Sequence, residues 1–332
     1  MVTLSPTTHN SGAPASASGM NLASLWWWLA WWLRPLVKWV LRRTTGLCEL
    51  QRICYGEVSG APRVKGVERS LASSRHPQLR QLVAHLDDVA ARRCFTGANE
   101  RQLLQRAVSA VLVAKRINPT VHCGFVAAFG KCVEQIWGYR QLAAEVELLR
   151  QTPFDSADAS HERRLLDLWR SLRPDEPLQG RISKQWQDIG FQGDDPKTDF
   201  RGMGLLGLEN LLFFASEHRA PAHHVLAHSM HATAGYCFAI VGINITHMAW
   251  SMLRDGSAQT YFYNTSRSLP TLRLFHCFYS YLFYEFDRFW AEAKPTNIME
   301  FSTVKGQFER RVRVALSDPR TQFRVTLAVH HV

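Results

Sequence analysis

The spacing of apolar residues along the chain predicts a protein built from helices. Apolar side chains recur every three or four residues in segments 76–93, 103–112, 132–150, 165–172 and 272–290, which is the period of one buried helix face. Proline and glycine residues separate many of these segments, as expected where helices end. The pattern therefore predicts an all-α fold in which several helices share a core.

Three further segments complete the predicted fold. Residues 46–69 contain three closely spaced glycines and a proline, which predict a connector with a short helix at its start. Residues 236–253 are almost wholly apolar and predict a core helix, although the pattern alone also allows a short buried strand. Residues 298–316 predict a mixed, basic helix near the C-terminus.

Segment 186–215 combines two patterns. Its first part, residues 190–204, holds four glycines and one proline, which interrupt regular structure and predict a loop. Its second part places Leu205, Leu208 and Leu211 at helical spacing, which predicts a buried helix directly after the loop. We expect that helix to hold the end of the loop in place.

Arg201 stands in the middle of this predicted loop. Phe200 on one side can anchor the backbone, and Gly202 on the other lets a second backbone or a ligand approach closely. A guanidinium carries a permanent charge and a planar set of donors that suit phosphate oxygens. Spacing leaves two roles open, since Arg201 either points outward to a ligand or pairs with a nearby acid and stabilises the loop. The nearby acids are Asp188, Asp194, Asp195 and Asp199.

The N-terminal region divides into a polar and an apolar segment. Residues 1–20 are rich in small and polar types, carry no Lys, Arg, Asp or Glu, and are predicted to be disordered. Residues 22–33 form an apolar run of about half the length of roughly twenty residues that a spanning helix needs. Cations follow this run, whereas a signal peptide carries them before it.

We therefore expect residues 21–43 to form a helix lying on the cytosolic side of a membrane, with indole rings at the interface. Two alternatives remain: a helix docked on the protein's own core, and a tilted spanning helix that continues through Leu41. The residues expected at the membrane are Trp26, Trp27, Trp28, Trp31, Trp32, Arg34, Lys38, Arg42 and Arg43.

Composition narrows the classes of function. The formal net charge of +11 suits nucleic acid, anionic lipid or an acidic protein, but Lys and Arg alternate with acids and no nucleic-acid-binding motif accompanies them. Seven cysteines without a CxxC pair predict reduced thiols in the cytosol and no zinc finger of the paired-cysteine kind. The chain also lacks the GxxxxGK[ST] phosphate loop, so it is not itself a P-loop GTPase.

Five histidines crowd into residues 218–231, where His224 and His228 lie one helical turn apart. Zinc enzymes with this spacing carry a glutamate between the histidines and a third ligand elsewhere. The sequence shows neither a glutamate at that position nor a carboxylate ligand beside the pair. It therefore predicts structural or surface roles for these histidines and no metal site.

Residues 186–208 resemble the central motif of the ELMO domain-containing (ELMOD) proteins. The similarity covers roughly residues 46–310, and residues 70–130 depart most from the family pattern. It is also carried by CELQRICY (48–55), GYRQL (138–142), RISKQW (181–186), FAIVGINIT (238–246) and IMEFSTV (298–304).

This resemblance implies an all-helical module that acts as a GTPase-activating protein for Arf and Arl small GTPases. The motif arginine, here Arg201, is implied to be the catalytic group, inserted into the partner's nucleotide site. GTP and Mg²⁺ then belong to the partner, and no cofactor of the chain's own is expected. The alternative is a non-catalytic adaptor that binds GTP-loaded GTPases, although the intact Asp199-Phe200-Arg201-Gly202 favours activity.

The other loop residues are expected to support Arg201. Gly202 and Gly204 permit close approach, Asp199 orients the guanidinium, and Gln192 either positions water or makes a plain polar contact. The supporting set is Trp186, Gly190, Phe191, Gln192, Gly193, Asp195, Pro196, Asp199, Phe200, Gly202 and Gly204.

The predicted organisation is a disordered tail (1–20), a Trp-rich membrane segment (21–43), a helical extension (44–130), an ELMO domain (131–312) and a second tail (313–332). The protein is expected in the cytoplasm, on the cytosolic face of an internal membrane.

Overall fold

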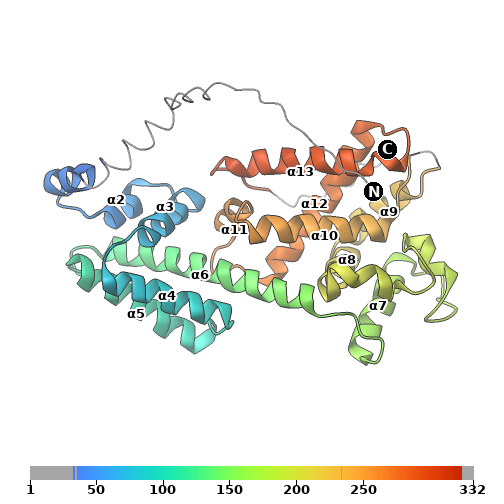
Figure 1. The fold of residues 1–332 in the computed structure, drawn as a ribbon, viewed down its shortest axis with the longest axis horizontal. Coiled ribbons are helices and arrows are strands. Elements are labelled where there is room, and N and C mark those ends of the chain that lie inside the picture. Colours follow the sequence, from blue (N-terminus) through green and yellow to red (C-terminus); the bar gives the residue numbers. More distant parts are fainter. Residues whose placement is uncertain (1–32, 34–35, 233, 324–332) are drawn as a thin grey trace, which may run out of the picture. The chain divides into compact units, whose positions relative to one another are not determined.

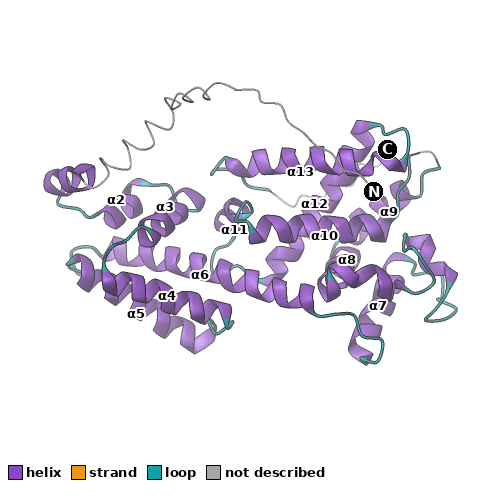
Figure 2. Cartoon of the chain, viewed as in Figure 1, coloured by secondary structure: helices purple, strands orange, loops and turns teal. Residues whose placement is uncertain are grey.

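The computed structural model describes residues 33, 36–232 and 234–323. It contains two compact units, residues 1–49 and 50–332. Every regular element of the described residues is a helix, as Figures 1 and 2 show, so the predicted all-α fold is confirmed. Residues 236–253, for which a strand remained possible, are helical from Phe238 onward.

The helices after residue 48 include the predicted apolar segments, but some of them begin earlier than predicted and others were not predicted. Their bounds are α2 (Glu49–Gly56), α3 (Ala61–Ala72), α4 (Pro77–Ala91), α5 (Gly97–Lys115), α6 (Cys123–Gln151), α7 (Ala159–Leu172), η1 (Lys184–Ile189), η2 (Pro196–Gly202), α8 (Gly204–Glu217), α9 (Arg219–Ser229), α10 (Phe238–Arg254), α11 (Gln259–Thr265), α12 (Leu272–Ala293), η3 (Ile298–Glu300) and α13 (Phe301–Ser317).

Helix α8 is surrounded by other helices of the second unit. It contacts α6, α7, α9, α10 and α12 (Figure 1). Most of its side chains are buried, including Leu205, Leu208, Leu211 and Phe214. Burial of apolar surface on most sides of such a helix stabilises the fold by about 25 cal/mol per Å² of apolar surface. The residue before α8 therefore has a fixed position in the core.

Helix α6 joins two groups of helices. It packs against α3, α4 and α5, and also against α8, α10 and α12. The sequence places the boundary between extension and domain at residues 130–131, which lies inside this helix. The extension and the domain thus share one continuous element, and they form one compact unit.

Two parts of the predicted fold need correction. Residues 46–69 are more than a connector, because α3 begins at Ala61 and includes Pro62 in its first turn, where proline costs no helical hydrogen bond. The predicted C-terminal tail begins too early at 313, since α13 continues to Ser317 and buries Val312 and Leu316. Asn264 then binds the carbonyls of Pro319 and Thr321.

A buried polar group links three of the central helices. Asn210 on α8 donates to Thr246 Oγ1 on α10 at 3.1 Å, and it accepts from His276 Nδ1 on α12 at 2.6 Å. Burial lowers the pKa of His276 to about 4, so the imidazole is neutral near pH 7. Each partner is satisfied, which is the condition for burying polar atoms without a large cost.

The first unit is described only in its last part. Residues 36–45 are helical, and Leu36, Val37 and Trp39 are exposed. Lys38 forms an ion pair with Glu49 at 2.6 Å, and Arg42 and Arg43 are exposed. Among the described residues, no helix combines the length and apolar character needed to span a bilayer. Outside the described residues lie Trp26, Trp27, Trp28, Trp31, Trp32 and Arg34.

Candidate functional site

The segment predicted as a loop contains two short 3₁₀ helices, η1 and η2. Ser183 caps η1 by accepting from the backbone N–H of Gln185, and Asp195 caps η2 by accepting from that of Lys197. Pro196 occupies the first turn of η2, where its missing N–H costs nothing. The prediction of an irregular loop over residues 190–204 is therefore wrong for Pro196–Gly202. The loop is a compact, capped turn of backbone.

A ladder of five aromatic rings fixes this turn to the helical body. The ring centroids of Trp169 and Trp186 lie 5.5 Å apart, those of Trp186 and Phe191 5.8 Å, those of Phe191 and Phe200 5.6 Å, and those of Phe200 and Phe154 5.8 Å. All five side chains are buried. Such contacts add to the energy of apolar burial. Phe200, next to Arg201, is thus held in a packed site.

Polar contacts hold the outer side of the turn. Arg181 Nε binds Glu162 on α7 at 2.5 Å, and Arg181 Nη1 lies 2.9 Å from Asp195. The same guanidinium lies over the ring of Phe154. A planar group that bridges two carboxylates restricts both of them. Arg181 was not among the site residues predicted from sequence, although it lies in the RISKQW similarity.

Two glycines of the turn have positive φ and close neighbours. Gly190 has φ 83°, and a Cβ there would lie 2.2 Å from the backbone nitrogen of Phe238. Gly204 has φ 52°, and a Cβ there would lie 2.4 Å from the carbonyl oxygens of both Arg150 and Thr152. Such contacts exclude a side chain at both positions. The expectation that Gly204 leaves room for a partner is wrong, because α6 fills that space.

Gly202 and Gly193 differ from these two glycines. A Cβ added at either position would meet no heavy atom within 4 Å. Neither residue has a positive φ. Gly202 is exposed directly beside Arg201, so the surface there is open to another molecule.

Arg201 lies at the end of η2 with its side chain exposed. Its Nε donates to the carbonyl of Thr198 at 2.9 Å, which fixes the start of the guanidinium. Within the described part of the chain, Arg201 forms no ion pair with an acid. The alternative in which it forms an ion pair with Asp188, Asp194, Asp195 or Asp199 to stabilise the loop is not what the structure contains.

Asp199 acts on the backbone of the turn. Its Oδ2 accepts from the N–H of Gln192 at 3.0 Å, which joins the start of the turn to η2. Burial raises the pKa of Asp199, while the Gln192 N–H and the positive charge of Arg201 oppose that shift. Arg201 is near enough to influence the Asp199 pKa, but the hydrogen-bonding partner of its Nε is Thr198. The side chain of Gln192 is exposed.

The turn presents the positive charge of Arg201 in a position where an anion can bind. Arg201 combines a rigid base, built on Phe200 and Thr198, with terminal guanidinium nitrogens that have no hydrogen bond in the described residues. A group of this kind can give two parallel hydrogen bonds to a phosphate. The chemical capacity of Arg201 is therefore charge stabilisation.

A second cluster lies outside this turn. His224 and His228 on α9 meet Asp287 on α12, and one ligand atom from each lies within 4.8 Å of the others. The sequence argument that no carboxylate accompanies the histidine pair is therefore wrong. Asp287 comes from α12, which starts more than forty residues after His228. The one feature of the sequence that could have drawn attention to Asp287 is that it is an acid within an aromatic stripe.

Comparison with known proteins gives consistent results. Residues 144–305 match the model of the ELMO/CED-12 family. The chain is 43% identical to ELMO domain-containing protein 2 of Bos taurus over 282 residues, which cover 85% of this chain and 91% of that protein.

Two further relatives show how widely the similarity extends. ELMO domain-containing protein 1 of Mus musculus is 42% identical over 300 residues, covering 85% of this chain and 88% of that protein. ELMO domain-containing protein B of Dictyostelium discoideum is 34% identical over 284 residues, covering 83% and 93%. The alignments therefore include the turn, its supporting helices and much of the helical extension.

Proposed function

The chain belongs to the ELMO/CED-12 family, and on this premise we propose that it is a GTPase-activating protein for small GTPases of the Arf and Arl families. The observation that carries the proposal is the exposed guanidinium of Arg201 on a rigid turn, which is held at Nε by the Thr198 carbonyl and has no ion-pair partner among the described residues. In this proposal Arg201 enters the nucleotide site of the partner, which supplies GTP and Mg²⁺. The chain itself needs no cofactor.

The required chemistry matches what this turn offers. During GTP hydrolysis, negative charge spreads over the transferred phosphoryl group, and an arginine supplied by a second protein accelerates the reaction by about 10³ to 10⁵. At about 1.4 kcal/mol per factor of ten, this is roughly 4 to 7 kcal/mol of transition-state stabilisation. Such a contribution requires a donor that is already positioned before the complex forms.

The neighbours of Arg201 have separate roles in this proposal. Phe200 and the other rings of the aromatic ladder are buried, so they hold the turn in position when the partner docks. Gly202 leaves space for the partner's backbone or nucleotide. Asp199 keeps the turn closed through the Gln192 N–H, and the exposed Gln192 side chain is free to contact the partner or its attacking water.

A panel of purified GTP-loaded Arf and Arl proteins tests the proposal. Single-turnover hydrolysis is measured with and without this chain, and we expect a large acceleration for at least one member. The main rival is an adaptor that binds GTP-loaded GTPases without accelerating hydrolysis. Saturable, GTP-dependent binding with an unchanged hydrolysis rate across the panel would favour the adaptor and contradict the activator.

We further propose that residues 21–43 bind the cytosolic face of an internal membrane, where Arf- and Arl-type partners would be met. The described end of this segment supports the proposal, since Leu36 and Trp39 are exposed beside the cations Lys38 and Arg42. Apolar and indole groups combined with basic ones are typical of helices that lie in a membrane interface.

Deleting residues 21–43 is expected to move the protein from the membrane fraction to the soluble fraction after cell lysis. The reason is the loss of both the apolar and the basic contribution to membrane binding. Deletion of residues 1–20 is the matched control, because that segment carries no Lys, Arg or Trp. An unchanged membrane-bound fraction after the first deletion would contradict the membrane proposal.

A further inference from the structure

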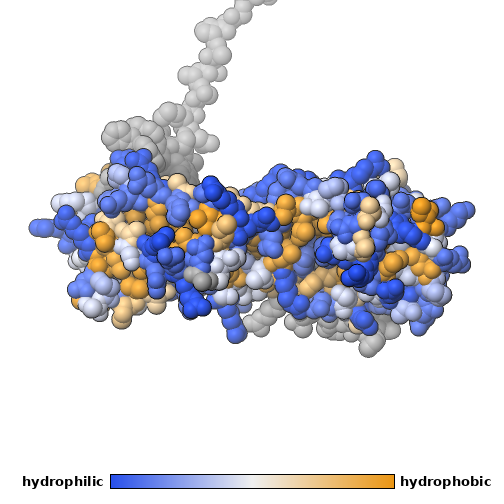
Figure 3. Space-filling model, turned by 90° about the horizontal axis from the view of Figure 1, so that it is seen from below, coloured by the Kyte–Doolittle hydropathy of each residue, from blue (hydrophilic) through white to orange (hydrophobic). Residues whose placement is uncertain are grey.

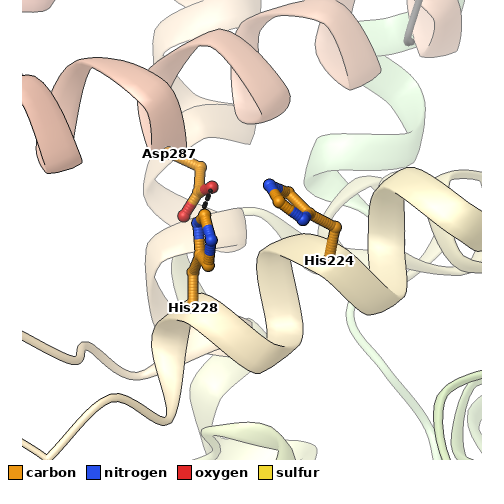
Figure 4. A group of neighbouring side chains, drawn as sticks. All are labelled: His224, His228 and Asp287. Carbon is orange, nitrogen blue, oxygen red and sulfur yellow. Dashed lines mark hydrogen bonds and ion pairs between the residues drawn. The ribbon is translucent and has the colours of Figure 1, made fainter. Parts of the chain in front are cut away.

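Figure 4 shows three side chains that converge between α9 and α12. His224 and His228 project from neighbouring turns of α9, and Asp287 points toward them from α12. The ring centroids of the two histidines lie 4.1 Å apart. The cluster is remote in sequence from the Arg201 turn and has no part in the function proposed above.

The spacing of these groups suits a small metal ion. Zn²⁺ binds imidazole nitrogen and carboxylate oxygen at about 2.0 to 2.2 Å, so the ligand atoms of a tetrahedral site lie roughly 3.3 Å apart. His228 Nδ1 lies 2.9 Å from Asp287 Oδ2, and one ligand atom from each of the three residues lies within 4.8 Å of the others. A rotation of the His224 ring, which no hydrogen bond in the described residues restrains, is enough to complete a three-ligand face.

The carboxylate is held in a way that is typical of metal ligands. Asp287 is 1% exposed, and its Oδ1 accepts from the hydroxyl of Tyr236 at 2.6 Å. This leaves Oδ2 directed toward the histidines. A second hydrogen-bonding partner that fixes a ligand in this manner is found beside most protein metal sites.

The site is also accessible to an ion. The His228 side chain is 47% exposed, and His224 is partly exposed, whereas Asp287 is buried behind them. An ion can therefore enter from solvent, and a water molecule can take the remaining coordination position. Two imidazoles favour a late first-row cation over Mg²⁺ or Ca²⁺, which take oxygen ligands.

We propose that His224, His228 and Asp287 form a zinc-binding site that ties α9 to α12. The proposal replaces the expectation, drawn from the local sequence alone, that the chain has no metal site. Without the ion, the buried carboxylate is balanced by Tyr236 and by one histidine. With it, a single divalent charge contacts all three ligands and joins two helices that both pack on α8.

Titration of the full chain with ZnCl₂ after chelator treatment tests the proposal. Calorimetry is expected to show one site removed by His224→Gln and by His228→Gln, with affinity falling at least about 100-fold, since loss of even an outer contact costs about 10- to 100-fold. His85→Gln is the matched control, because His85 is an exposed histidine on α4. Wild-type protein is expected to unfold at a higher temperature with zinc present, and His224→Gln is not.

Cobalt separates this site from the free thiols. Cys94, Cys123 and Cys237 are exposed, and thiolates are ligands for divalent metals. Co²⁺ bound by imidazole and carboxylate shows visible d–d bands without the near-ultraviolet charge-transfer band of a Co–thiolate bond. Asp287→Asn, which keeps the shape of a buried side chain, is expected to abolish the visible bands.

His224→Gln and His228→Gln alter partly exposed residues, so their folding is checked by circular dichroism and they remain informative if Asp287→Asn does not fold. The proposal is overturned if no saturable zinc binding occurs. It is also overturned if binding persists unchanged in His224→Gln and His228→Gln, or if the cobalt spectrum is wholly of the thiolate type.

Discussion

Replacing Arg201 by lysine is expected to lower stimulated GTP hydrolysis by about 10³- to 10⁵-fold while the protein stays folded. Lysine keeps the positive charge but loses the planar donors that contact two phosphate oxygens at once. It also loses the Nε that binds the Thr198 carbonyl, so the charge is no longer held in place. The measurement is single-turnover hydrolysis with the GTPase found responsive in the panel.

The design separates catalysis from association. Binding of the partner loaded with a non-hydrolysable GTP analogue is measured for the same variant, and we expect it to change little. Arg219→Lys makes the same chemical change at an exposed position on α9 and should leave hydrolysis unaltered. Rapid hydrolysis with the Arg201→Lys protein would show that Arg201 is not the catalytic group.

Replacing Gly204 by alanine is expected to destabilise the fold by at least about 2 kcal/mol. The positive φ alone costs an alanine roughly 1 to 2 kcal/mol. The new methyl would also lie 2.4 Å from two carbonyl oxygens near the end of α6, so the backbone must move. The free energy of unfolding from urea denaturation measures the change.

Gly202→Ala is the matched control, two residues away in the same turn. Its methyl meets no atom within 4 Å and its φ is not positive, so the free energy of unfolding should change by no more than about 0.5 kcal/mol. If Gly202 faces the partner as proposed, stimulated hydrolysis should nevertheless fall. Equal destabilisation by the two substitutions would contradict the packing described for Gly204.

Much of the fold follows from helical periodicity, because long apolar stripes leave little freedom. The stripes at 76–93 and 272–290 predict the ends of α4 and α12 to within three residues. Short helices are harder to predict from periodicity, and α11, with seven residues, was not predicted. A helix of that length has too few turns to show a period, and its stability comes from contacts with α3, α6 and α13.

The site was partly predictable for a related reason. Glycine and proline content marks residues 190–204 as unusual, whereas the role predicted for Arg201 came from the family resemblance. This content does not distinguish Gly202, which has open space beside it, from Gly204, which other atoms surround. The difference depends on the carbonyls of Arg150 and Thr152, which lie far away in the sequence. The contact between His228 and Asp287 could not be predicted from sequence either, because the fold brings together residues that are far apart in the chain.

The sharing of α6 limits how far the protein can be shortened. The family match starts at residue 144, in the middle of that helix. Tyr139, just before it, donates to the Leu253 carbonyl and packs against Phe262 and Tyr263. A fragment cut at the start of the match would carry open apolar surface and an orphaned carbonyl. A fragment meant to fold by itself must therefore begin before Tyr139, upstream of the family match.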